Sequence, residues 1–265
     1  MYNLIQADLF KLRKSISIKI LFVITTVSAV AMTLIAYMIP QGKIDSSMTG
    51  IGFMFSDVNV ISILGGVIAG IIICADFDNK IIHDAIAQGC SRGTVIASKA
   101  IVLCCTLAFI LLPYAIVTGI GFSTGHKFSM GSVAIGFLHI LTTDGATAIS
   151  ASGICKLFIV MLTLIIVYAA QLSICIPLAI VLKKPVLVVP IYYGISLLSA
   201  QLMRLKGKSI VFDGIFDCTP FGGNYEFATL KTGAGDIFKA IAVSLFFIAV
   251  MLVITYLGFR KSEIK

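Results

Sequence analysis

The sequence has few charged residues: only 12% are Asp, Glu, Lys or Arg, against roughly 25% in soluble domains. Hydrophobic residues make up 59% of the chain, and the mean hydropathy is +1.08. No polar stretch is long enough to bury a core of its own, which argues against a separate soluble domain. We therefore predict a single all-α integral membrane domain over residues 1–265.

Motifs for catalysis and nucleotide binding are also absent. No CxxC pair occurs among the seven cysteines, so neither a metal site nor a disulfide framework is indicated. No HExxH motif occurs, and no nucleophile and base lie at membrane depth, which excludes an intramembrane hydrolase. Residues 93–100 resemble a phosphate loop, but Ser98 replaces its second glycine and Ala100 its magnesium-binding hydroxyl. Energy for uphill transport would have to come from another chain.

Apolar runs long enough to cross a bilayer occur six times. A transmembrane helix needs about 20 mainly apolar residues, whose backbone groups must bond within the helix. Within the bounds chosen, the runs contain no Asp, Glu, Lys, Arg or His, which disfavours ion-coupled transport, although sodium sites built from carbonyls remain open. The predicted spans are 20–39, 58–75, 100–122, 157–182, 186–203 and 240–259.

The distribution of basic residues predicts the orientation. With both termini cytoplasmic, twelve of the twenty Lys and Arg lie inside, as the positive-inside rule requires. Arg204, Lys206 and Lys208 are the main exceptions. A signal peptide cleaved near residues 29–31 is the alternative for the first run, but the run continues past that point, so we expect an uncleaved anchor.

The N-terminal segment, residues 1–19, combines apolar and basic residues. Four apolar residues fall on one face of a helix, with three basic residues mostly off that face. This pattern is typical of a helix in the membrane interface, and a cytoplasmic extension of the first span fits it equally well. The apolar residues are Ile5, Leu9, Leu12 and Ile16, and the basic residues are Lys11, Arg13 and Lys14.

Two further segments are assigned to the outer side. In the first, the apolar core 133–141 is too short to cross and predicts an interfacial or re-entrant helix; His126 and His139 lie in this segment and are assigned no chemistry. The second is the outer loop 204–236, whose Gly and Pro content predicts ordered turns more than helix. Its carboxylates lack calcium-loop spacing and are expected to form a solvated surface: Asp213, Asp217, Glu226 and Asp236. Cys155 and Cys218 could meet there as a disulfide, but nothing requires it.

The polar segment 76–99 lies between the second and third spans. Asp76, Asp78 or Asn79 is expected to cap the start of a helix of about 11 residues. Ile82, Ile86 and Gly89 share one face of this helix. Gly89 is expected to end it in the left-handed conformation. Ser91 or Thr94 is expected to cap a second helix that runs through Lys99 into the third span. This segment is either a handle by which a soluble partner moves the membrane helices or an ordinary capped loop.

The whole chain resembles the permease subunit of type-two ATP-binding-cassette (ABC) exporters, the group that includes bacitracin and lantibiotic self-protection transporters. The similarity covers the "DLFKLRKS" leader, the six spans, the segment after the second span and the closing "YLGFRKSEIK". The outer loops are short, unlike those of some peptide-antibiotic exporters. In these relatives the segment after the second span is a coupling helix that docks on the ATPase. The matching or neighbouring positions here are Asp78, Lys80, Ile82, Ile86, Gly89, Ser91, Arg92 and Lys99.

The resemblance implies a bacterial plasma-membrane exporter of an antimicrobial peptide or another amphipathic compound. It further implies two ATPase subunits, a second permease copy or a related permease, membrane lipid around them, and no nucleic acid. ATP and Mg would bind to the ATPases, with no cofactor, metal or catalytic site on this chain. Arg92 and Lys99 would face the ATPase or lipid phosphates, and both fit equally well as positive-inside residues with no role in coupling. Sodium or small-drug efflux, and a scaffold or sensor that transports nothing, are the alternatives.

Overall fold

The computed structural model describes residues 1–45, 49–130, 134–144 and 151–261, and the described residues are all-helical or irregular. In chain order the helices are α1 (Tyr2–Lys14), α2 (Ile16–Met38), α3 (Thr49–Met54), α4 (Asp57–Ala69), the π-helix η2 (Gly70–Cys74), α5 (Ala75–Asp78), α6 (Ile81–Ala87), α7 (Arg92–Thr124), α8 (Phe137–Asp144), α9 (Ala151–Leu172), α10 (Cys175–Leu182), α11 (Pro185–Leu202), the 3₁₀ helix η4 (Met203–Leu205), α12 (Ile210–Asp217), the 3₁₀ helix η5 (Tyr225–Phe227) and α13 (Ala234–Lys261).

Six helical segments in the described part of the chain are long and apolar enough to cross a membrane, as predicted. The second consists of α4, η2 and α5 in one continuous run, and the fourth joins α9 to α10. Each extends a few residues beyond one or both predicted ends, so that charged residues such as Asp57, Asp76 and Lys99 lie near the helix termini. The segments are Ile16–Met38, Asp57–Asp78, Arg92–Thr124, Gly153–Leu182, Pro185–Leu205 and Ala234–Arg260.

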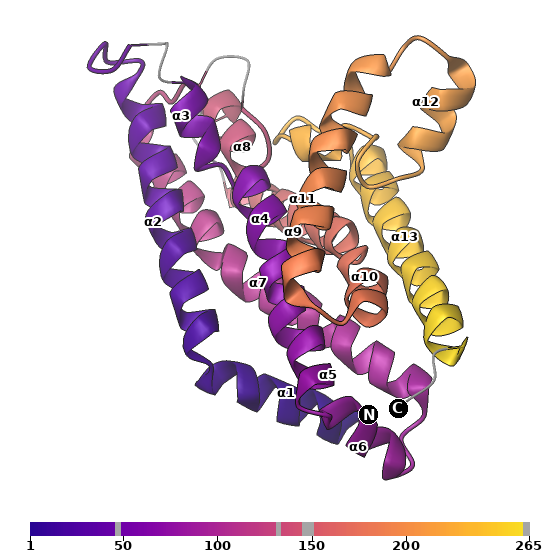
Figure 1. The fold of residues 1–265 in the computed structure, drawn as a ribbon. Helices are drawn as coiled ribbons and strands as arrows, with labels where there is room; N and C mark the ends of the chain where they lie inside the picture. The colour runs from indigo at the N-terminus through magenta and orange to yellow at the C-terminus, as the bar shows by residue number, and fades with distance from the viewer. Residues whose placement is uncertain (46–48, 131–133, 145–150, 262–265) are drawn as a thin grey trace.

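Different short helices lie at the two ends of the bundle (Figure 1). At the α6 end lie α1, α6 and the C-terminal end of α13, so both termini are on the same side. At the α8 end lie α3, α8 and α12 (Figure 1). An even number of crossings requires this arrangement of the termini, and the predicted topology shares it.

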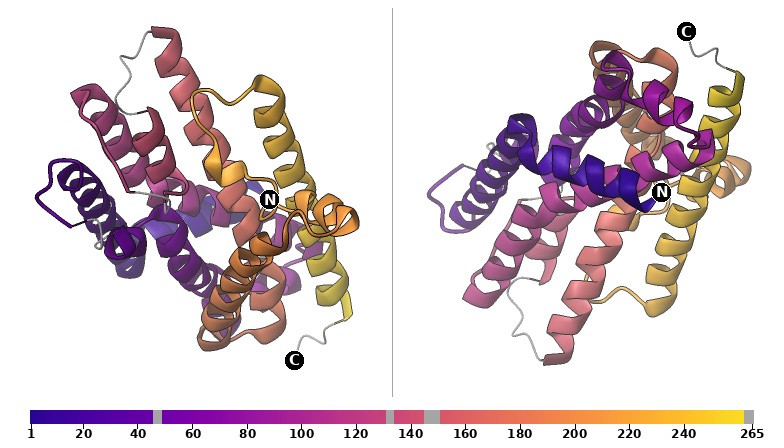
Figure 2. Two further views of the ribbon diagram at one scale, coloured as in Figure 1. Left: turned by 90° about the horizontal axis from the view of Figure 1, so that it is seen from above. Right: turned by 90° about the horizontal axis from the view of Figure 1, so that it is seen from below.

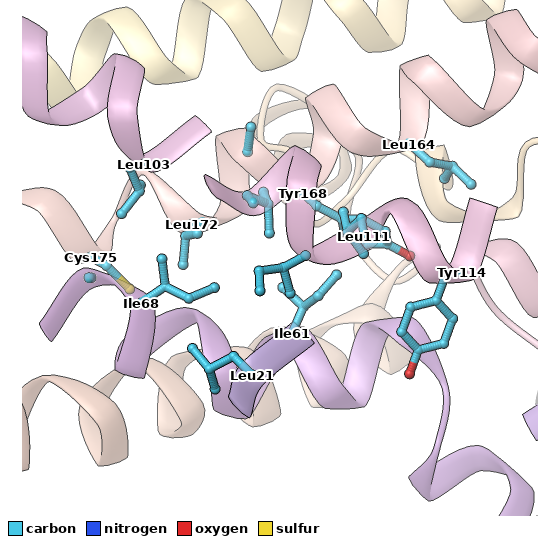
Figure 3. Packing of buried hydrophobic residues seen from close by; sticks show 14 of the residues in the cluster. Leu21, Ile61, Ile68, Leu103, Leu111, Tyr114, Leu164, Tyr168, Leu172 and Cys175 are labelled. Atoms are coloured by element: carbon cyan, nitrogen blue, oxygen red, sulfur yellow. The ribbon is translucent and has the colours of Figure 1, made fainter. Parts of the chain in front are cut away.

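Helix α7 is the central element of the bundle. It packs against α1, α2, α4, α8, α9 and α13, and views along the bundle show α1 lying across it (Figure 2). The core that surrounds α7 is apolar and continuous, and its Leu103 and Leu111 belong to one cluster with side chains of neighbouring helices such as Leu172 (Figure 3). A movement of α7 would therefore change the packing of most other helices.

Helices α4 and α11 pack at close range because α4 carries two adjacent glycines. A Cβ atom at Gly66 would lie 2.7 Å from the Cα of Val189, and one at Gly65 would lie 3.0 Å from Tyr192 Cε1. Small residues at helix contacts allow backbones to approach in membrane proteins. This contact fixes the second span against the fifth.

The structure bears on four of the predictions about residues other than the spans themselves. Helix α1 is not a straight extension of the first span, because the chain breaks at Ser15, whose backbone is extended, and α1 turns away from α2 (Figure 1). The predicted short helix in 133–141 is present as α8. The prediction of turns rather than helix in 204–236 was wrong in part, because Ile210–Asp217 form α12. Cys155 and Cys218 are both free thiols.

Candidate functional site

The candidate site lies at the α6 end, where the second span turns into the third. The chain leaves α5 at Asn79 and turns through Lys80, which adopts a left-handed conformation (φ 58°). After α6, Gly89 is also left-handed (φ 91°), and the amides of Gly89 and Cys90 bond to the carbonyls of Ile86 and Ala85, each at 3.0 Å. This is a Schellman motif, which favours glycine at the left-handed position, as the sequence predicted.

Two details of the predicted α6 were wrong. The helix has seven residues, Ile81–Ala87, and not about 11. Asp76, Asp78 and Asn79 do not cap it, because the second span stays helical through Asp78 and leaves Lys80 at the N-cap without a side-chain bond. The Asn79 side-chain amide instead donates to the Ala75 carbonyl at 2.7 Å.

The N-terminus of α7 is capped as predicted. Ser91 is the N-cap residue, and its Oγ accepts a hydrogen bond from the Thr94 amide at 3.1 Å. Such a cap satisfies one of the four amides that a helix start leaves without partners. Helix α7 then runs without interruption from Arg92 into the third span.

Helix α6 has one buried face and one exposed face. Ile82, only 2% exposed, and Ala85 point into the protein, and Ile86 packs against the core at its edge. Lys80 and Asp84 are exposed on the other side; the remaining exposed residues of this turn are Asp78, Asn79, Ile81, Ala87, Gln88, Gly89 and Ser91. The helix is therefore anchored to the spans while it presents a mixed polar and apolar surface.

A cluster of four charged residues joins α1, α5 and α7 beside α6. Lys99 of α7 is 4% exposed, and its ammonium donates to both oxygens of Asp8, at 2.8 and 2.7 Å, and to Asp76. Asp76, which is 1% exposed, also pairs with Lys11 of α1. Two cations and two carboxylates thus alternate in one network, as a buried charge requires.

This network changes the place of Lys99. The sequence interpretation put its charge on a surface that faces an ATPase or lipid phosphates, whereas the structure places it inside the protein, bound to two carboxylates. Asp8 was not singled out, and Asp76 was considered only as a cap. Two signals in the sequence could have indicated buried ion pairs. Asp8 is an isolated acid in a basic leader, and Asp76 follows directly after a long apolar run.

Arg92 connects the start of α7 to the end of α13. Its Nη1 donates to the carbonyls of Phe259 and Arg260, at 2.6 and 2.9 Å, and the guanidinium lies 5.4 Å from the centre of the Phe259 ring. The last carbonyls of a helix lack partners within the helix, so Arg92 supplies donors that they need. The Phe259 ring also meets Phe77 edge-on, at 6.1 Å, which links α13 to α5.

The other basic residues of the leader lie toward solvent. Arg13 and Lys14 are exposed, with the Lys14 ammonium 5.6 Å from the centre of the Phe10 ring. Leu12 is the buried residue of α1, whereas Leu9 and Ile16 of the predicted apolar face are exposed within this chain. Leu12 and the charge cluster thus attach the leader to the bundle, while apolar side chains such as Leu9 and Ile16 stay exposed.

A buried acid, Asp57, and a half-buried acid, Glu226, lie toward the α8 end. Asp57, fully buried, accepts hydrogen bonds from the Tyr168 hydroxyl and from the Phe137 amide at 3.1 Å. The prediction that Glu226 belongs to a solvated surface was wrong: its Oε1 accepts a hydrogen bond from the Gln171 side-chain amide. Burial is the main cause that raises the pKa of Glu226 to about 7, and the charge of Asp57 adds to it.

Two further acids of the 204–236 segment and His139 make local contacts. Asp217 pairs with Lys206 at 2.8 Å, and Asp213 accepts from the Gly207 amide. His139 stacks edge-on against Phe227 with ring centres 5.4 Å apart. Among the residues that the structure describes, no group of three or more His, Cys, Asp or Glu is placed to hold a metal ion.

Comparisons with protein-family models, with curated proteins and with solved structures gave no match for this chain.

Proposed function

We propose that this chain is the membrane-spanning permease subunit of an ABC exporter, driven by a separate ATPase that docks on α6. The observation that carries the proposal is the double character of α6. Ile82 and Ala85 anchor it to the spans, while Lys80 and Asp84 face outward from the end where both termini lie. A force applied to this exposed surface would pass directly to the second and third spans.

The charge cluster makes the connection between α6 and the spans rigid. Asp76 lies five residues before α6 and Lys99 lies twelve residues after it, and the two are bonded to each other. Buried ion pairs resist separation because breaking one leaves an uncompensated charge. A partner that pushes on α6 would therefore move α5 and α7 together, in the manner of a switch between two packed states.

Helix α1 fits a position in the membrane interface on this proposal. It turns away from α2 and leaves Tyr2, Leu9 and Phe10 exposed beside Arg13 and Lys14. Apolar side chains flanked by basic residues are typical of helices that lie between headgroups and acyl chains. The basic residues would then meet anionic headgroups on the cytoplasmic side, which agrees with cytoplasmic termini.

A second permease would cover spans that are poorly buried in this chain. In the most apolar stretches of the fifth and sixth spans, only 11% of the residues are buried, against 61% in the second and 72% in the fourth. Lipid or a second permease must therefore contact α11 and α13. We place the route of an amphipathic compound at such an interface, because an apolar surface can contact such a compound without charged residues inside the spans.

A charge reversal on the exposed face of α6 tests the proposal. Lys80→Glu should sharply reduce the ATPase that co-purifies with the tagged chain and the ATP hydrolysis that it stimulates. The matched control is Lys127→Glu, an exposed lysine at the other end of α7. Wild-type chain that brings down no ATPase, or equal losses in both variants, would contradict the proposal.

Arg92→Glu is a poorer test than the sequence alone indicated. Arg92 donates to the carbonyls that end α13, so its replacement would disturb the helix contact as well as any partner. Reduced ATPase association by this variant would not separate docking from folding. Lys80 avoids this difficulty, because its side chain is exposed and it makes no ion pair among the described residues.

A further inference from the structure

A cavity of about 210 Å³ lies beside Glu226, between α4, α9, α11 and the segment that contains η5. Its lining is mainly apolar and includes three aromatic residues, Phe53, Phe221 and Phe227. Gln171, Ser196, Ser199 and Glu226 supply the polar groups. A mostly apolar hollow with a few convergent polar groups is the usual form of a small-molecule site.

The polar side of the cavity is built and held in place. The Gln171 side-chain amide donates both to Glu226 Oε1 and to the carbonyl of Pro220, the latter at 3.1 Å. In the described part of the chain, Glu226 Oε2 has no hydrogen-bond partner, and it is not one of the fully enclosed oxygens. One oxygen is thus fixed by the protein, and the other is left to accept a bond from a ligand.

The chemistry of the lining favours an organic cation over a metal ion. Calcium takes six to eight oxygen ligands and magnesium six, and no cluster of three metal-binding side chains occurs among the described residues. Aromatic rings attract ammonium groups through their faces. Two of the rings are themselves fixed by neighbours, Phe221 by Phe247 and Phe227 by His139.

We propose that this cavity binds a primary ammonium group attached to an apolar body, with Glu226 as the counter-ion and the phenylalanines around the apolar part. A cavity of about 150 Å³ holds a benzene molecule, so 210 Å³ has room for one ring and a short amine arm. The identification of such an amine as part of the exported compound rests on the proposed function, whereas the binding itself does not.

The experiment measures binding of 2-phenylethylammonium and of its neutral counterpart 2-phenylethanol to the full chain in lipid nanodiscs by calorimetry. The wild type should bind the amine saturably at one site. Glu226→Gln should weaken amine binding about tenfold or more, the loss of one charge-assisted contact, and change alcohol binding little. The glutamine keeps an acceptor for Gln171, so the local fold should persist.

Two further variants separate charge from space. Ser199→Leu fills the cavity and should weaken both ligands, whereas Asp213→Asn removes a charge from the same loop, away from the cavity, and should change neither. Absence of amine binding to the wild type, or equal affinity of Glu226→Gln and wild type, would overturn the proposal, as would an equal loss in Asp213→Asn. This binding experiment contains no ATPase, so its failure would not contradict the proposal that an ATPase docks on α6. Conversely, failure to find an ATPase that associates with the chain would not contradict binding of the amine in this cavity.

Discussion

Lys99 shows how one side chain holds three helices at the α6 end. Its ammonium is bound to Asp8 of α1 and to Asp76 of α5, and little of the side chain reaches solvent. Lys99→Met would leave both carboxylates in place with the cation missing. Breaking a buried pair in this way costs about 3–5 kcal/mol, so we expect a loss of that size in the free energy of unfolding, measured by denaturant titration in detergent.

The matched control for Lys99 is Lys127→Met, which removes an exposed lysine that makes no ion pair among the described residues. It should change stability by less than about 1 kcal/mol. Adding Asp8→Asn to Lys99→Met should restore part of the loss, because Asp8 has no other cation among the described residues, whereas Asp76 keeps its pair with Lys11. Equal stabilities of the two lysine variants would show that the cluster does not hold the helices.

Glu226 should make stability depend on pH. Its pKa rises from the usual 4.5 to about 7 on folding, mainly through burial. Between these values the folded chain holds the proton more tightly than the unfolded chain, so the free energy of unfolding falls as pH rises, by at most about 1.4 kcal/mol per pH unit. Relative to Glu226→Gln, the wild type should therefore lose stability from about pH 4.5 to 7; parallel pH profiles would contradict this.

At the scale of the element, the contact between α4 and α11 depends on the absence of a side chain. Gly66→Ala places a Cβ 2.7 Å from the Val189 backbone, which cannot rotate away. Alanine is favoured over glycine in a helix by about 1 kcal/mol, but overpacking of this kind costs about 1–3 kcal/mol. We expect net destabilisation, read from the thermal unfolding midpoint of the purified protein.

Gly194→Ala in α11 is the control for this contact. No atom lies within 4 Å of the position that its Cβ would take, so only the gain in helix propensity remains and the midpoint should stay or rise. A rise in both variants would mean that α4 and α11 are not held at this distance.

The elements that sequence patterns predicted are those in which a single physical property dominates. Long uncharged runs define the spans, Ser91 ends a loop where a helix cap is needed, and Gly89 occupies a position that other residues rarely adopt. The start of α6 was missed because the second span continues through Asp76, whose charge is buried only by virtue of Lys99. An ion pair between residues far apart in the sequence produces no periodic pattern from which it could be predicted.

The same limit applies to the candidate sites. Glu226 and Gln171 are 55 residues apart in sequence, and local composition around Glu226 indicates only a polar loop. The sequence placed Arg92 on a surface that faces an ATPase or lipid phosphates, which stays a prediction. Its contact with the carbonyls at the end of α13 was not predicted, because it depends on how the last helix returns to the first turn of α7. Such contacts need the three-dimensional arrangement.

For the whole molecule, the proposed function rests on three features: six apolar spans, two termini at the same end of the bundle, and one helix that is both exposed and anchored. On that proposal the chain is a permease that a separate ATPase drives. The energy would enter at α6 and spread through α5, α7 and the helices that α7 contacts. The cavity beside Glu226 is lined by residues of the second, fourth and fifth spans and of neighbouring loops, and none of its lining residues belongs to α6.

The most direct test places a photo-crosslinking amino acid at position 84 on the exposed face of α6, in the native host, with position 210 of α12 as the control. Residue 210 is 93% exposed and lies at the other end of the bundle. The account predicts a crosslink from position 84 to an ATP-binding-cassette ATPase, and none from position 210. No ATPase crosslink from position 84, or equal crosslinks from both positions, would contradict it.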